Sequence, residues 1–189
     1  MSRKKNLLIV LLIFGASGCI FKHPSVINVP SQYKILDTAQ VLNAHALKEG
    51  GNLLMVPFKA GVGVEASDEL DKLALMIIRG AAQTLENNAT PYRILDAQNA
   101  SQAQMVMQGY VLQRSRPGGW QRWFPGPKEI LLKVEGRLTE GRTGALILHF
   151  IHQKRADLRE KDEMALAEEI GRDIGKFLVR AEHRSQTID

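Results

Sequence analysis

Hydrophobic residues recur along the chain with two periods, and these periods predict its helices and strands. Apolar positions three and four residues apart predict a helix that follows Ser67 and ends at Asn87. Ser67 can cap this helix, and Asp68 and Glu69 lie in its first turn, where the helix dipole favours acids. A second apolar stripe of the same period predicts another helix over residues 161–180.

Shorter apolar runs, separated by turn residues, predict strands. In one of them, residues 130–138, apolar and polar positions alternate, so one face should be buried and the other wet. A hairpin turn is expected at residues 141–144, and a short helix within residues 38–47. The expected strands span residues 53–58, 91–95, 104–114, 130–138 and 145–151.

The resulting order, β-α-β-β-β-β-α, predicts an α/β fold of the α+β type in one compact domain. We expect a mixed, mainly antiparallel sheet with the helices packed on one face. The domain boundaries that follow are residues 1–18 for a signal peptide, 19–50 for a lipidated cysteine and extended tether, 51–180 for the domain, and 181–189 for a polar tail.

The first residues have the order of an export signal: cationic residues 3–5, apolar residues 7–14, then small residues 15–18 and Cys19. The apolar run is shorter than the roughly 20 residues that span a bilayer, which argues against the alternative of an uncleaved membrane anchor. We therefore expect a cleaved signal peptide, with the cut between Gly18 and Cys19.

Residues 16–19 resemble the lipobox of bacterial lipoproteins, with Ala16 where leucine is usual. The resemblance implies that the thiol of Cys19 carries a diacylglyceryl group and that its amine is acylated, with fatty acids such as palmitate as the acyl chains. Two or three acyl chains anchor a protein stably. Ile20 follows the cysteine, as in lipoproteins that are sorted to the outer membrane, so we expect an outer-membrane anchor with the domain facing the periplasm.

Charge and cysteine content support an exported, non-nucleic-acid-binding protein. The whole chain has 25 basic and 20 acidic residues, a net charge of +5. Without the three cations of the leader the balance is 22 to 20, which removes the compositional support for nucleic-acid binding. The chain has 1 cysteine, so no disulfide can form within it, and Cys19 stands where acylation would occur.

Motifs of catalysis or cofactor binding are weak. Residues 61–63 read Gly-Val-Gly between a strand and a helix, but no parallel βαβ unit is expected there, so a flexible turn is favoured over a dinucleotide site. His149 and His152 lie three apart on a strand and should point to opposite faces, away from any shared metal. With no G-x-S-x-G motif, we expect no enzyme, cofactor or metal site.

Residues 114–128, which join two strands, form the candidate interaction hairpin. They contain both tryptophans of the chain among glycines, prolines and cations. Exposed aromatic residues in loops usually pack or bind something. They could fold back over the end of the domain, contact another subunit, enter a membrane headgroup region, or stack on a polymer. The candidate contact residues are Arg116, Trp120, Arg122, Trp123, Phe124 and Lys128.

Four segments together resemble a group of bacterial envelope lipoproteins, whose domain is similar to the N-terminal domain of TolB, the curli-secretion channel lipoprotein and the lipoprotein of Pel polysaccharide export. The resemblance implies a non-enzymatic envelope component, often part of an oligomeric export assembly. The segments are the strand that ends at residues 56–58, residues 103–109, where Gln104 replaces the family's acid, the hairpin 134–144, and the helix segment 167–175.

The sequence thus predicts a lipid-anchored structural or assembly protein whose partners are a membrane and further copies or other envelope proteins. The alternative is a monomeric periplasmic binding module for polysaccharide or lipid.

Overall fold

The structure is a computed structural model that describes residues 35–116 and 128–184. Its helices are α1 (Ala44–Glu49), α2 (Asp68–Glu86), the 3-10 helix η2 (Ala97–Gln102) and α3 (Glu163–Arg184). Its strands are β1 (Thr38–Val41), β2 (Gly51–Met55), β3 (Lys59–Ala60), β4 (Tyr92–Leu95), β5 (Met105–Ser115), β6 (Glu129–Glu140) and β7 (Leu146–Asp157). None of the helices in this described part is long and apolar enough to cross a membrane.

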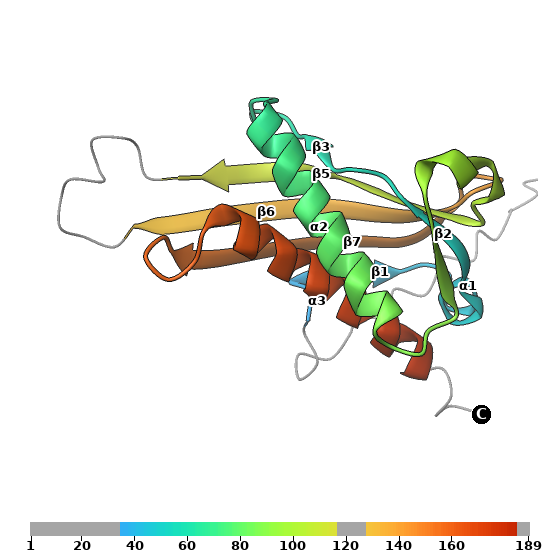
Figure 1. Cartoon of the computed structure of the whole chain (residues 1–189). Coiled ribbons are helices and arrows are strands. Elements are labelled where there is room, and N and C mark those ends of the chain that lie inside the picture. The colour runs from blue at the N-terminus through green and yellow to red at the C-terminus, as the bar shows by residue number, and fades with distance from the viewer. Residues whose placement is uncertain (1–34, 117–127, 185–189) are drawn as a thin grey trace, which may run out of the picture.

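One mixed sheet of seven strands forms the body of the molecule (Figure 1), with the order β1-β7-β6-β5-β2-β4 and with β3 beside β5. The strands β5, β6 and β7 pair antiparallel, whereas β2 runs parallel to both β4 and β5. The predicted α/β class and mixed sheet are confirmed. The expectation that no parallel βαβ unit occurs is wrong, because β2, α2 and β4 form one.

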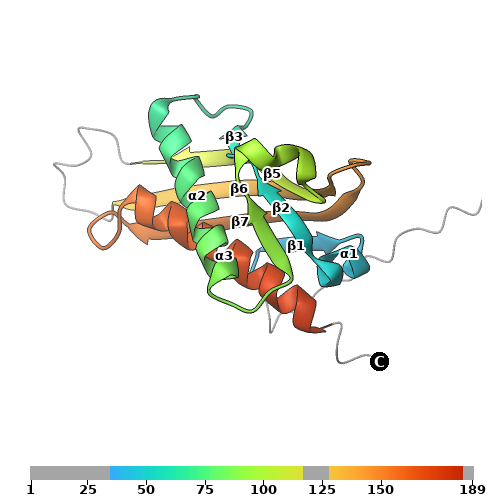
Figure 2. The same cartoon turned by 45° about the vertical axis from the view of Figure 1, so that its right-hand side comes forward.

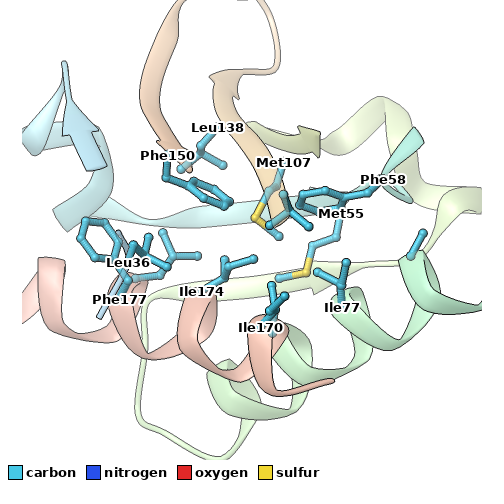
Figure 3. Packing of buried hydrophobic residues seen from close by; sticks show 14 of the residues in the cluster. Leu36, Met55, Phe58, Ile77, Met107, Leu138, Phe150, Ile170, Ile174 and Phe177 are labelled. Atoms are coloured by element: carbon cyan, nitrogen blue, oxygen red, sulfur yellow. The ribbon is translucent and has the colours of Figure 1, made fainter. Parts of the chain in front are cut away.

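Both long helices cover the same face of the sheet, as the two views in Figures 1 and 2 show. The even-numbered residues of β6 from Ile130 to Leu138 are buried against them, which matches the predicted alternation. Figure 3 shows how Met107, Leu138 and Phe150 of the sheet lie over Ile170 and Ile174 of α3. This layer between helices and sheet is the hydrophobic core.

The two helices touch at glycines. A Cβ atom built on Gly80 would lie 2.2 Å from the carbonyl oxygen of Glu168, and one built on Gly171 would lie 2.0 Å from that of Ile77. Real Cβ atoms do not approach so closely, so each helix needs a glycine where the backbone of the other passes. The contact fixes the position of α2 relative to α3.

The folded region begins earlier than the predicted start at residue 51. β1 pairs with β7, and Leu36 and Leu47 are buried in the core. The hydroxyl of Tyr92 donates a 2.6 Å hydrogen bond to the carbonyl oxygen of Leu47, which ties α1 to β4. The residues from 35 to 50 therefore belong to the domain and not to the tether, because their few apolar side chains complete one edge of its core.

The other face of the sheet is not covered by any described element. Its side chains are mostly polar, and they come from alternate positions of four strands. Thr38 and Gln40 of β1 lie on this face with His149, Ile151 and Gln153 of β7, Lys133, Glu135 and Arg137 of β6, and Gln108, Tyr110 and Gln113 of β5. We call these residues the uncovered face.

Candidate interaction site

The candidate interaction hairpin joins the end of β5 to the start of β6, at the left-hand end of the sheet in Figure 1. Of its predicted contact residues, the structure describes Arg116 and Lys128, one on each side. Trp120, Arg122, Trp123 and Phe124 lie outside the described residues, as do the predicted lipid-carrying Cys19 and the cleavage position at Gly18.

Arg114 clamps the end of β5 to both helices. Its Nε and Nη2 atoms donate hydrogen bonds of 3.1 and 2.8 Å to the two carboxylate oxygens of Glu163, at the start of α3. The same Nη2 donates a 2.7 Å bond to Oε2 of Glu69, in the first turn of α2. The paired, two-point contact of a guanidinium with a carboxylate is strong and directional. It fixes the strand end from which the hairpin departs.

The contacts within this clamp shift the pKa values of Arg114 and Glu69 so that the charged forms are favoured. The hydrogen bonds to Glu163 raise the pKa of the Arg114 guanidinium; burial opposes them, the bond to Glu69 adds to them, and the net shift is upward. The hydrogen bond from Arg114 lowers the pKa of the Glu69 carboxyl, and the nearby charges of Arg114 and Arg116 lower it further. The shifted pKa values of Arg114 and Glu69 therefore keep these two groups charged at neutral pH.

Arg116 and Lys128 complete the base of the hairpin. The Nη1 atom of Arg116 lies 3.5 Å from Oε2 of Glu69, and the side chain is 40% exposed, so it joins the clamp loosely. On the opposite strand, the carbonyl oxygen of Lys128 accepts a 2.7 Å hydrogen bond from the backbone N–H of Leu158. Both ends of the hairpin are thus tied to the domain.

A groove of about 440 Å³ runs beside this clamp. One wall is the end of β5, and the other is the loop that leads into α2. Residues 61–63, the Gly-Val-Gly segment, lie in that loop after β3, where Gly63 has a φ of 80° and Val62 is fully exposed. This turn agrees with the interpretation favoured from sequence. The groove is lined by Gly63, Val64, Glu65, Ser67, Glu69, Leu112, Gln113, Arg114 and Arg116.

The uncovered face carries a second polar cluster, formed by three of its residues. Glu135 accepts a hydrogen bond from Arg137 at 3.1 Å and contacts Nε2 of His149 at 2.9 Å. The hydrogen bond with His149 is the main cause that lowers the pKa of the Glu135 carboxyl, against a smaller opposing effect of burial. Tyr110, directly opposite Glu135 on β5, is 43% exposed.

His152 points to the opposite face, as its spacing from His149 predicted. It is 5% exposed, and its Nδ1 and Nε2 atoms lie 3.1 Å from Oδ2 of Asp37 and 3.3 Å from Oδ2 of Asp173. Burial raises the pKa of Asp173, but hydrogen bonds from His152 and Lys154 outweigh it and hold that pKa well below its usual range. This cluster joins Asp37, directly before β1, to β7 and α3.

The two histidine clusters are polar contacts that join neighbouring elements of the fold. His149 and His152 each bind carboxylates on their own side of the sheet. Within residues 35–116 and 128–184, no group of three or more histidine, cysteine, aspartate or glutamate side chains could hold a metal ion.

Sequence reasoning missed the clamp and the groove. Arg114 was recognised only as a cation of the hairpin, and Glu69 only as a favourable first-turn acid. The two carboxylates that bind Arg114 are 45 and 49 residues away along the chain, and no local pattern pairs them. The groove depends on where β3 stops beside β5, and two paired residues are too few to leave a periodic signal.

The molecule belongs to the class of single mixed sheets with two long helices on one face. Two solved structures of PelC dodecamers from Paraburkholderia phytofirmans share this fold. One is 16% identical and covers 75% of this chain and 96% of its own, with a TM-score of 0.53. The other, a variant in which methionine replaces one leucine, is 17% identical and covers 75% of this chain and 98% of its own, also at 0.53.

These likenesses confirm the fold that the resemblance to the Pel-export lipoprotein implied. A lipoprotein from Neisseria meningitidis is more distant, at 14% identity and a TM-score of 0.42, covering 74% of this chain and 99% of its own. No protein-family model matches the sequence, and no curated protein matches it either. The comparisons thus establish the architecture of the domain.

Proposed function

We propose that this protein is a lipid-anchored, non-catalytic component of the bacterial cell envelope that assembles with further copies of itself through the hairpin end of its sheet. The observation that carries the proposal is the clamp of Arg114, Glu163 and Glu69. It fixes the base of a hairpin whose sequence holds both tryptophans. A rigid base lowers the entropy lost when aromatic side chains are placed in an interface.

The residue types of the hairpin fit a contact between subunits. Interfaces between subunits are enriched in tryptophan, tyrosine and arginine, and a few such side chains supply most of the binding energy. The hairpin offers Trp120, Trp123 and Phe124 with Arg116 and Arg122 beside them. The shared fold of PelC, which was solved as a dodecamer, supports assembly as the use of this domain.

The location follows from the N-terminal sequence. A cationic, apolar and small-residue leader before Cys19 supports cleavage and acylation at that cysteine. Ile20 supports sorting to the outer membrane, with the domain in the periplasm. An acylated Cys19 would hold every copy at the same membrane surface, which raises the effective concentration of one copy around another.

The test replaces the aromatic residues and counts the subunits. We expect the full-length double variant Trp120→Ala/Trp123→Ala, extracted in mild detergent, to lose the oligomer seen for the unchanged protein while keeping its melting temperature within a few degrees. The matched control is Leu75→Ala, a 52% exposed apolar residue on the outer side of α2, which should leave the oligomer intact. An unaltered oligomer in the double variant, or its unfolding, would count against the hairpin as the contact.

A second candidate function, a monomeric binding module for polysaccharide, is favoured by one observation. A small hollow of about 60 Å³ opens on the uncovered face beside Gln108, Tyr110 and Arg137. An exposed aromatic ring with amide and guanidinium groups is suited to hydroxyl-rich ligands. If this function holds, soluble bacterial polysaccharide should bind the monomer, and Tyr110→Ala should weaken that binding at least tenfold.

A further inference from the structure

The outer edge of β5 is only partly used. β2 pairs with it at residues 105–107, and β3 pairs with it at Tyr110 and Val111. The last hydrogen bond along this edge is donated by the backbone N–H of Gly61 to the carbonyl oxygen of Val111, at 2.9 Å. From Leu112 to Ser115, no strand of the described chain lies beside it. A free edge of this kind is a ready template for another strand.

The groove of about 440 Å³ lies along this free edge. Leu112, Gln113 and Arg114 form its β5 side, and the loop residues Val64 and Glu65 form the other. The four residues of the edge span about 13 Å at ~3.3 Å per residue. A short extended segment that enters the groove can bond to β5 through its backbone, which is the mode called β-augmentation.

We propose that residues 25–29 of a neighbouring copy's tether add as a strand to the β5 edge at Leu112–Ser115 and fill this groove. The proposal rests on the proposed function, since it adds a second contact, beside that of the hairpin, between the copies that assemble. Residues 25–29 read Ser-Val-Ile-Asn-Val, with three β-branched apolar residues in strand-forming order. Pro24 and Pro30 bound the segment, so its length matches the free edge.

The charges of the tether and the polarity of the groove both favour the proposed pairing of residues 25–29 with β5. Residues 20–34 include Lys22 and Lys34 and no acid. On the loop side of the groove, Glu65 is exposed and makes no ion pair with any described residue. Val64 and Leu112, both half-buried, offer an apolar surface to every second side chain of an added strand.

The tether of one chain is too short to reach the free edge of its own β5, so the donated strand must come from another copy. The described chain starts at Ile35, which packs against the core near β1, an edge strand three places away from β5 in the sheet. Crossing from β1 to the position beyond β5 takes four strand spacings, about 19 Å, and going around a side-chain layer adds about 10 Å. The six residue-to-residue steps from Val29 to Ile35 reach only about 21 Å. A donated strand in a neighbour is reachable and gives a head-to-tail contact that can close into a ring.

Disulfide trapping tests the contact in the full-length, membrane-extracted protein. Cys19 is the sole cysteine, so an introduced thiol is unambiguous once Cys19 is acylated. Two differently tagged chains are coexpressed, one with Ile27→Cys and one with Gln113→Cys. We expect a mixed disulfide that contains both tags. The control pairs Ile27→Cys with Arg79→Cys, on the exposed side of α2, and should give none.

Proline substitution gives the second readout. The double variant Ile27→Pro/Asn28→Pro removes backbone N–H groups from the donated segment, so at least one bond to β5 is lost. We expect its oligomer to dissociate at a protein concentration at least tenfold higher than that of the control Ser31→Pro/Gln32→Pro. We expect both variants to keep the melting temperature of the unchanged domain, because residues 27–32 lie N-terminal to Leu36 and the other buried side chains of the core.

The outcomes separate the two proposals. An oligomer that gives the mixed disulfide and is weakened by the Ile27 and Asn28 prolines supports strand donation. If the oligomer gives no disulfide with Gln113→Cys and its dissociation is unchanged by those prolines, strand donation is overturned and the proposed assembly is not. If a chain that carries both Ile27→Cys and Gln113→Cys forms the disulfide within itself, and the two coexpressed single variants form none, donation between copies is overturned. A monomer overturns the proposed assembly, and strand donation with it.

Discussion

The helix crossing at Gly171 predicts that replacing this glycine by alanine destabilises the domain. Whether the variant is less or more stable than the unchanged protein therefore tests the packing of α2 against α3. In the Gly171→Ala variant the added Cβ would lie 2.0 Å from the carbonyl oxygen of Ile77, where ordinary contact begins at 3.4 Å, so α2 and α3 must move apart by about 1.4 Å. The atoms nearest the added Cβ belong to the backbone of α2, and at Gly80 the backbone of α3 comes almost as close. The clash therefore cannot be relieved by rotation of a side chain. Overpacking of this kind costs ~1–3 kcal/mol.

Helix propensity opposes the clash in Gly171→Ala, so a loss of stability in this variant can be attributed to the clash. Alanine is favoured over glycine inside a helix by ~1 kcal/mol, so without the clash the substitution would stabilise the protein. With the clash at the upper end of its range, we expect a net loss of about 2 kcal/mol, which lowers the melting temperature of a domain of this size by ~4–8 °C. Thermal unfolding followed by circular dichroism measures it, with Arg79→Ala on the exposed side of α2 as the near-neutral control. An unchanged or higher melting temperature for Gly171→Ala would refute the close crossing.

Three further predictions concern polar contacts. Glu163→Gln breaks the two-point contact with Arg114 and leaves that cation half-buried, so urea unfolding should show a loss of ~1.5–3 kcal/mol. Asp173→Asn should destabilise the domain at pH 7. Because the folded pKa of Asp173 lies below its unfolded value of ~3.9, the stability difference from the unchanged protein should be full above about pH 5 and shrink as the pH falls below 4. Tyr92→Phe removes the buried hydrogen bond to Leu47, and the urea midpoint should report a loss of ~1–2 kcal/mol; no loss would show that α1 is not held by this bond.

The two long helices were predictable because each repeats one apolar stripe over many turns. The expected helix after Ser67 is α2, with Ser67 as its cap, and the expected helix at 161–180 is α3. The alternation along residues 130–138 likewise predicted the buried face of β6. These signals are local, and they extend over enough residues to stand out from the background of the sequence.

The remaining features depend on contacts between distant parts of the chain. Residues 38–41 were expected to begin a helix, but they form β1 because the edge of β7 is free to pair with them. The direction of β2 relative to β4 follows from the path of α2 across the sheet, which no local pattern records. The clamp at Arg114 required the starts of both helices to meet the end of β5, and only the folded structure brings them together.

The central claim, a lipid-anchored protein that assembles through the hairpin end of its sheet, is tested most directly by one measurement. The full-length protein is extracted from its membrane in mild detergent, its native mass is determined, and the mass of its N-terminal peptide is read from the same sample. We expect a discrete oligomer of chains that begin at an acylated Cys19. A monomer, or chains with an unmodified Cys19, would contradict it.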